Sequence, residues 1–387
     1  MDFTKVTGFL ESLGSAGIPG TDLAIYLCGK EVYRNRTGFS NLENRTPIAP
    51  DTIYPFYSMT KVITCTCALR LYEEGKFNLI DPVGDYLPEF KNMTVRKVRE
   101  NGITEIVPAS APIRVVDLFT MSSGLTYNPT PELSKLQQET EGNYSLKEFA
   151  AAVAKDPLFF EPGTRWHYGI SHDILGRLIE VLSGKTLGEY FRDNIFTPLD
   201  MPDTGFRLAE DKLNRLVTCY SYDEQTKTHS KSGAVPVAYY NPDSPHYLSP
   251  DFKYESGGGG LVSTVDDYAK FANALCSGGT AKCGYRVLGK ATIELMRTNH
   301  LDDARMRDYE WPHHSGYGYG LGVRTMVDRA AGGSNGSIGE FGWSGMAGTI
   351  LLIDPAVDLV YVYAQQLTPS KEEHVAPRLR AAVYGCL

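Results

Sequence analysis

The sequence predicts an α+β fold in which an antiparallel sheet, flanked by helices, is built from both ends of the chain. Near the N-terminus, the apolar runs Asp22–Cys28 and Glu31–Thr37 are separated by a two-residue turn, the pattern of a β-hairpin. Near the C-terminus, Thr349–Ile353 and Leu359–Tyr363 are rich in β-branched and aromatic residues, which favour strands. The residues between these two ends are mainly helical in pattern.

Capping side chains mark the helices that we expect beside this sheet. Residues 2–14 form the first of them, with a glycine at its end. Ser263 and Asp266 stand at nearly the spacing of a capping box and begin a second helix. Ser370 and Glu373 have the spacing of a full capping box and begin the last helix.

The stretch between the two ends differs in character and predicts a second domain. It holds long loops, many of the prolines and helices such as Ser171–Ser183, in which leucine and isoleucine side chains mark one face. We therefore expect an α/β domain from residues 1–75 together with 256–387, containing the antiparallel sheet. Residues 76–255 form a mainly helical inserted domain with long loops.

Composition excludes several classes of function. The 387 residues are 42% hydrophobic and 22% charged, with a net charge of −8 and no block of lysine or arginine. This balance argues against nucleic acid or an anionic membrane surface as a partner. No apolar run approaches the roughly 18 residues of a membrane span. The N-terminus lacks the features of a secretory signal, so we expect a cytoplasmic protein. A homo-oligomer is compatible with the sequence.

Cysteine and histidine spacing gives no metal or disulfide signal. The seven cysteines are odd in number and scattered, which favours reduced, mostly buried thiols. His167 and His172 are five residues apart, which is not the spacing of a helical metal pair, and we interpret them as structural or pocket-lining. We expect no metal and no cofactor.

The segment Ser58-Met59-Thr60-Lys61 opens a long apolar-periodic run that we expect to be a buried helix reaching about Glu74. A spacing of three puts both side chains on one helix face, so Lys61 can reach the Ser58 hydroxyl. Lys61 can act as a base only with a depressed pKa, which we expect burial to supply. The four-residue pattern occurs about once by chance in such a chain, and a capping serine with an exposed lysine is the ordinary alternative.

Two further segments hold residues that suit acyl transfer. Tyr168 lies in the loop before the helix Ser171–Ser183, and a phenolic oxygen held near Lys61 can carry a proton from nucleophile to leaving group. The glycine-rich segment 339–349 leads into a strand, where small residues allow a substrate to lie along the strand edge. Taken singly, a packing tyrosine and a glycine turn are the ordinary interpretations.

In combination and in this order, these segments resemble the serine β-lactamase and penicillin-binding protein superfamily. The resemblance covers most of the chain and implies the β-lactamase/transpeptidase-like fold. Three more stretches similar to family motifs lie in the expected order: Pro108–Leu125, Glu161-Pro162-Gly163 before the tyrosine, and Ser256–Thr264 leading to Asp267.

Two departures from the family pattern change the expected substrate. Where class C β-lactamases have Tyr-x-Asn, this chain has Tyr168-Gly169-Ile170, so the amide-binding asparagine is missing. Where they have Lys-Thr-Gly, it has Trp343-Ser344-Gly345, which replaces a cation that engages a substrate carboxylate with an apolar indole. Trp-x-Gly is similar to the family VIII carboxylesterases, which have a β-lactamase fold, and to related acyltransferases.

The resemblance implies a role for each matching residue. Ser58 is the acylated nucleophile, and Lys61 and Tyr168 are the coupled base and proton shuttle. The backbone N–H groups of Ser58 and Met346 form the oxyanion hole. Trp343 lines the acyl pocket, and the substrate-binding residues are Trp343, Ser344 and Gly345.

A rival motif points to a different hydrolase fold. Gly332–Gly336 matches Gly-x-Ser-x-Gly, with Asp354 and His374 following in the chain order of an α/β-hydrolase triad. That motif requires a helix immediately after the serine, whereas the following Ser337–Gly342 has no helical pattern. The parallel βα repeats of that fold are also missing from the sequence.

The sequence thus predicts a serine carboxylesterase that cleaves esters of small, uncharged acyl groups through an acyl-enzyme, with a small-molecule ester or amide as its substrate. The alternatives that stay open are a β-lactamase, a D-amino-acid peptidase or amidase, and an acyltransferase. A catalytically silent binding or scaffold module is the alternative outside enzymes.

Overall fold

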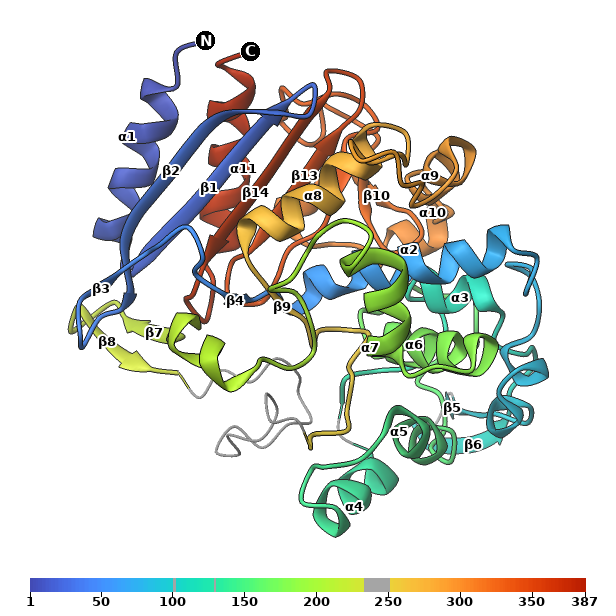
Figure 1. Cartoon of the computed structure of the whole chain (residues 1–387). Helices are drawn as coiled ribbons and strands as arrows, with labels where there is room; N and C mark the ends of the chain where they lie inside the picture. The colour runs from blue at the N-terminus through green and yellow to red at the C-terminus, as the bar shows by residue number, and fades with distance from the viewer. Residues whose placement is uncertain (100–101, 129, 233–250) are drawn as a thin grey trace.

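An eight-stranded antiparallel sheet lies at the centre of the structure, a computed structural model that describes residues 1–99, 102–128, 130–232 and 251–387 (Figure 1). The strand order is β10-β11-β12-β13-β14-β1-β2-β3, so the N-terminal hairpin and the C-terminal strands pair side by side. The predicted antiparallel sheet is confirmed. Its strands are β1 Gly20–Leu27, β2 Lys30–Asn41, β3 Thr46–Pro47, β10 Tyr317–Tyr319, β11 Arg324–Met326, β12 Phe341–Gly342, β13 Ile350–Asp354 and β14 Leu359–Gln365.

Both faces of the sheet are covered, because alternate residues of a strand point to opposite sides. In β14, Leu359, Tyr361 and Tyr363 pack in the apolar cluster that holds α1 and α11. Val360 and Val362 belong instead to the larger cluster, on the side of α8. Figure 1 shows α1 and α11 behind the sheet and α8 crossing in front of it.

The helix α2, Thr60–Glu73, packs against α6 and is buried along most of its length, as its apolar sequence predicts. Within the described residues, no helix has the length and apolar character needed to cross a membrane. The other helices are α1 Thr4–Ser12, α3 Val115–Phe119, α4 Pro131–Glu139, α5 Leu146–Val153, α6 Ser171–Ser183, α7 Leu187–Phe191, α8 Val265–Cys276, α9 Lys290–Met296, α10 Asp303–Met306 and α11 Glu372–Tyr384.

Two of the predicted helix caps are wrong. Helix α8 is capped by Thr264, whose Oγ accepts from the N–H of Asp267 at 3.0 Å, so the cap lies one residue beyond Ser263. Helix α11 has no side-chain cap at all. The residue before it, Lys371, has a left-handed backbone (φ 56°), and the preceding Ser370 carbonyl accepts from a glutamine side chain, so the expected capping box does not form.

Three short two-stranded antiparallel sheets complete the fold: β4 Tyr54–Pro55 with β9 Val262–Ser263, β5 Thr94–Val98 with β6 Thr104–Pro108, and β7 Tyr220–Asp223 with β8 Thr228–Lys231. The β7 strand lies against the end of β14, because the N–H of Tyr220 donates to the carbonyl of Gln366 at 3.1 Å. Part of the segment 76–255 therefore contacts the central sheet directly. The division into two domains stays a prediction.

A buried histidine joins the helices that carry the candidate site. His172, in the first turn of α6, is fully buried beside Cys65 of α2, and its Nε2 lies 3.1 Å from the Phe119 carbonyl of α3. Burial, together with the charge of Lys61, lowers the pKa of His172 to about 3. The structural interpretation made from the sequence fits this position.

The burial of His172 predicts that the folded protein loses stability as the pH falls. The folded chain keeps His172 neutral, whereas the unfolded chain protonates it below its ordinary pKa of about 6.5. Its contribution to stability is therefore complete above pH 6.5 and is lost as the pH falls toward 3. At pH 5 we expect a loss of about 2 kcal/mol from this group. Urea unfolding of wild type and His172→Gln at pH 7 and pH 5 measures the free energy of unfolding of each protein. An equal change in this free energy between the two pH values in both proteins contradicts the prediction.

Candidate active site

Ser58 stands in a single 3₁₀ turn, Tyr57–Met59, that leads directly into α2. Tyr57 has φ of 45°, a left-handed conformation that is rare for a bulky residue and that often marks a functional position. The turn is held by the backbone of the segment before β9, since the N–H of Phe56 donates to the Leu261 carbonyl at 2.9 Å. The Ser58 side chain is half-buried at the mouth of this turn.

Lys61 is fully buried one helical turn further along, on the same face as Ser58. Its ammonium donates to Ser58 Oγ at 3.2 Å, to the Tyr127 hydroxyl at 3.0 Å and to the carbonyl of Gly258. Three acceptors match the three N–H donors of an ammonium group. The predicted contact between serine and lysine is present.

The expected depression of the lysine pKa is wrong. Burial lowers the pKa of Lys61, but the oxygens of Tyr127 and Tyr168 raise it by more, so the pKa lies above its ordinary value. The hydrogen bonds to Ser58 and Gly258 favour the ammonium form as well. In this arrangement Lys61 is a fixed positive charge with no lone pair for the serine proton.

Tyr168 reaches the same place from the loop before α6. The ammonium of Lys61 lies 4.7 Å from the centre of its ring, and its hydroxyl accepts from Trp343 Nε1 at 3.1 Å. The residue after it must be glycine, because a Cβ on Gly169 would lie 2.5 Å from the Leu125 carbonyl oxygen. Close contact between these two loops therefore fixes the tyrosine.

Tyr127 is a second tyrosine of the site, which the sequence analysis missed. It follows the Ser123-Gly124-Leu125 stretch in the family-like motif, and that proximity was the available signal. Its ring centre lies 5.7 Å from that of Tyr168, and the two rings flank the lysine ammonium. Lys61 thus faces two phenolic oxygens instead of the one that we expected.

Asp173 fixes the carbonyl that completes the lysine site. This buried carboxylate accepts from the hydroxyls of Tyr254 at 3.0 Å and Ser256 at 2.6 Å, and from the N–H of Gly258 at 3.2 Å. Burial raises the pKa of Asp173, and its hydrogen-bond donors oppose that shift. The segment that supplies the Gly258 carbonyl to Lys61 is therefore held from the first turn of α6.

The glycine-rich segment 339–349 forms a tight turn between β12 and β13, beside Ser58. The N–H of Gly345 donates to the Thr349 carbonyl at 2.8 Å, and the Thr349 hydroxyl donates to the Phe56 carbonyl at 3.2 Å. Met346, at the tip, has a side chain that is 45% exposed. Within the described chain, the N–H groups of Ser58 and Met346 donate to no protein acceptor, as oxyanion-hole donors require.

Aromatic side chains surround Tyr168 on the side away from the lysine. Trp343 is buried, with its ring centre 5.6 Å from that of Tyr168, and the half-buried Trp311 lies 5.1 Å from the same ring. Ile170, at the position of the family asparagine, is buried and apolar. Sequence reasoning missed Trp311, which no motif marks. The role of Trp343 as an acyl-pocket wall stays a prediction, and its contact with Tyr168 adds a positioning role.

The rival serine motif has no triad geometry. Ser334 Oγ accepts from the N–H of Gly336 at 3.0 Å, and the Asp354 carboxylate accepts from the Tyr384 hydroxyl at 2.5 Å. The antiparallel order of the sheet also excludes an α/β-hydrolase fold. His167, the other histidine near the site, lies 3.2 Å from the Thr126 hydroxyl.

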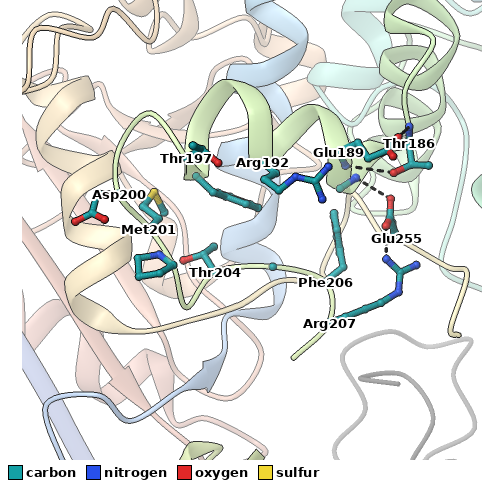
Figure 2. Close-up of a pocket in the computed structure, with 14 residues that line it drawn as sticks. Thr186, Glu189, Arg192, Thr197, Asp200, Met201, Thr204, Phe206, Arg207 and Glu255 are labelled. Atoms are coloured by element: carbon teal, nitrogen blue, oxygen red, sulfur yellow. Dashed lines mark hydrogen bonds and ion pairs between the residues drawn. The ribbon is translucent and has the colours of Figure 1, made fainter. Parts of the chain in front are cut away.

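A cavity of about 800 Å³ lies beside α7, away from Ser58 and Lys61 (Figure 2). Arg207 and Glu255 form an ion pair at 2.5 Å along one wall, and Glu255 also accepts from the N–H of Gly188 at 2.7 Å. Glu255 lies between Tyr254 and Ser256, both of which donate to Asp173. Glu255 therefore connects the cavity wall to the segment that carries the Gly258 carbonyl, and none of Ser58, Lys61 and Tyr168 lines the cavity.

Comparisons with known proteins show the family of the chain. A family model described as Beta-lactamase matches residues 6–385. Protein Rv1367c of Mycobacterium tuberculosis is 32% identical over 359 residues, which cover 91% of this chain and 85% of that protein. Esterase EstB of Burkholderia gladioli is 26% identical over 395 residues, covering 97% of this chain and 93% of that protein.

Among solved structures, EstCE1, described as a hydrolase with promiscuous acyltransferase activity, superposes with a TM-score of 0.82. It is 23% identical and the match covers 99% of this chain and 98% of that one, so this likeness concerns the fold. The predicted β-lactamase/transpeptidase-like fold is confirmed. With its family-model match and its relative in M. tuberculosis, the chain belongs to the beta-lactamase family.

Proposed function

We propose that the protein is a serine hydrolase that cleaves carboxylic esters of small, uncharged acyl groups through an acyl-enzyme on Ser58. The observation that carries the proposal is the hydrogen bond from the buried ammonium of Lys61 to Ser58 Oγ, beside two tyrosines. Such a grouping is costly to bury without a chemical role. It supports a catalytic site more strongly than a silent binding module.

In the first step, a tyrosinate oxygen of Tyr168 takes the proton of Ser58 as Oγ attacks the ester carbonyl. The fixed positive charge of Lys61 stabilises that tyrosinate, which is why a raised lysine pKa suits the role. Trp343 Nε1 holds the tyrosine oxygen in position. The serine thereby gains a proton acceptor although Lys61 is charged.

The developing oxyanion is stabilised by the N–H groups of Ser58 and Met346, each worth about 2.7–4 kcal/mol where such donors have been removed in other enzymes. Collapse of the tetrahedral intermediate breaks the ester C–O bond, and Tyr168 returns its proton to the leaving alcohol. Water then attacks the acyl-enzyme by the same steps in reverse order and releases the acid.

The substrate class follows from the walls of the site. Trp343 stands where a lysine pairs with the carboxylate of β-lactams, and its indole already donates to Tyr168. Trp311 and Ile170 extend the apolar character. An uncharged acyl group fits these surroundings better than an anionic one, which disfavours β-lactamase and D-amino-acid peptidase activity.

Acyl transfer to an alcohol other than water is the second candidate. EstCE1, whose fold the chain shares, is described as combining hydrolase and acyltransferase activity. An aromatic wall formed by Trp311 and Tyr168 suits an organic alcohol as acceptor. Product analysis with and without added alcohol separates the two activities.

Replacement of the nucleophile tests the proposal. Ser58→Ala should reduce turnover of p-nitrophenyl butyrate by about 10³-fold or more, since the variant lacks the hydroxyl that is acylated. Mass spectrometry should find the butyryl adduct on the Ser58 peptide of wild type. Unchanged turnover in the variant contradicts the proposed mechanism. Turnover of a chromogenic cephalosporin or a D-alanyl peptide alone overturns the ester class, and no turnover or adduct anywhere favours a binding module.

The two tyrosines should differ in their effect. Tyr168→Phe removes the proton acceptor and should reduce kcat/KM by about 10²–10⁴-fold. Tyr127→Phe removes a group that raises the Lys61 pKa, so the alkaline pH at which activity is lost should move downward. The pH profiles of kcat/KM measure both effects. Activity that rises in wild type as Lys61 loses its proton would show that neutral lysine is the base.

A glycine beside the nucleophile should tolerate no side chain. A Cβ on Gly345 would lie 2.5 Å from the Phe56 carbonyl oxygen and would also collide with Thr349. Gly345→Ala must shift the oxyanion turn away from Ser58, which we expect to cost about 10²-fold in kcat/KM. Gly14→Ala is the matched control, because a Cβ there meets no atom within 4 Å. Full activity of Gly345→Ala contradicts the assigned geometry.

A further inference from the structure

Three side chains that can ligate a metal meet behind the aromatic wall. His313 and His314 end a short 3₁₀ turn, η8 (Pro312–His314), which contacts the helix α11 that Glu372 begins. One ring nitrogen of each histidine and one carboxylate oxygen of Glu372 all lie within 4.8 Å of one another. Neither the sequence motifs nor the proposed hydrolysis uses this group.

One ring nitrogen of each histidine lacks a hydrogen-bond partner within the described chain. His314 is only 3% exposed, and its Nδ1 lies 2.9 Å from the Tyr309 hydroxyl, whereas its Nε2 has no hydrogen-bond partner. His313 Nδ1 is likewise buried without a partner. Its Nε2 lies 3.7 Å from the Glu372 carboxylate. Buried polar atoms without partners are rare and costly, and they require an explanation.

We propose that His313, His314 and Glu372 bind one zinc ion or a similar first-row transition metal. Two imidazoles and one carboxylate are a donor set that zinc accepts, while magnesium and calcium prefer oxygen alone. Zinc–ligand bonds of about 2.0–2.1 Å set tetrahedral ligands about 3.4 Å apart, so binding draws the three atoms together by up to about 1.4 Å. Bonding through Nε2 of His314 would give that buried nitrogen the partner that it lacks.

The surroundings supply access and orientation. His313 and Glu372 line a cavity of about 610 Å³, which gives the metal an entry path and room for a water as fourth ligand. Tyr309 acts in the second shell: if its oxygen accepts from Nδ1–H of His314, the lone pair stands on Nε2. The hydrogen bond thus selects the tautomer that binds metal.

The charged neighbours of the site limit its affinity without preventing binding. Burial lowers the pKa of His314, and the charges of His313, Arg324 and Arg380 act in the same direction. A metal binds the neutral form of the imidazole. The two arginines repel a cation, but Glu340 lies 4.0 Å from Arg380 and offsets part of that charge.

The metal would act as a structural clip. It would join η8 to α11, and Trp311, the residue just before η8, packs against both Tyr168 and Trp343. His314 itself lies 5.4 Å from the Trp343 ring. Binding would therefore stiffen the aromatic wall of the candidate active site without contacting Ser58.

Calorimetric titration with zinc chloride tests the site. The protein is first stripped with a chelator and its accessible thiols, including the exposed Cys28 and Cys283, are alkylated so that they do not compete. We expect one zinc per chain, with binding weakened at least about 10-fold in Glu372→Gln and in His313→Gln. Glu373→Gln and His374→Gln are matched controls that line the same cavity and should bind as wild type does.

Two further measurements guard against misfolded variants. Thermal unfolding without metal shows whether each variant keeps the native fold, and added zinc should raise the Tm of wild type and the controls but not of the ligand variants. Tyr309→Phe should weaken binding by about 10–100-fold. Zinc binding weaker than about 1 mM in wild type, or equal in wild type and both ligand variants, overturns the proposal.

Discussion

The hydrogen bonds of the buried Lys61 ammonium are the interactions on which the rest of the site depends. Its three donors reach Ser58, Tyr127 and Gly258, which come from three separate parts of the chain. An unpaired charge in this position would cost several kcal/mol, so α2, the loop before α4 and the segment before β9 must all be in place. The candidate catalytic group is therefore complete only when the fold has closed around α2.

Much of the fold could be predicted from the sequence, because it rests on local patterns. The hairpin turn, the β-branched strands β13 and β14, and the bounds of α6 follow from periodicity and turn chemistry. The capping residue of a helix depends on more than the local pattern. Thr264 and Ser263 are both good caps, and only the backbone at each residue decides between them.

The candidate site was predictable only where a motif carries it. Ser58, Lys61 and Tyr168 stand in recognisable segments, whereas Tyr127 and Trp311 enter through tertiary contact alone. The lysine pKa was mistaken for the same reason. The apolar pattern of a helix predicts burial, which lowers the pKa of a lysine. The tyrosine oxygens that raise the pKa of Lys61 by more come from residues 66 and 107 positions further along the chain.

The exchange of lysine for tryptophan at position 343 links recognition to catalysis. In this structure the indole N–H donates to the hydroxyl of Tyr168, the residue to which we assign the proton transfer. A lysine there would place a second cation near Lys61, and the two would compete for the tyrosinate charge. Tryptophan offers a neutral donor together with an apolar face. In the proposed function, the weak fit to anionic substrates and a catalytic group with a single cation therefore both depend on the tryptophan at position 343.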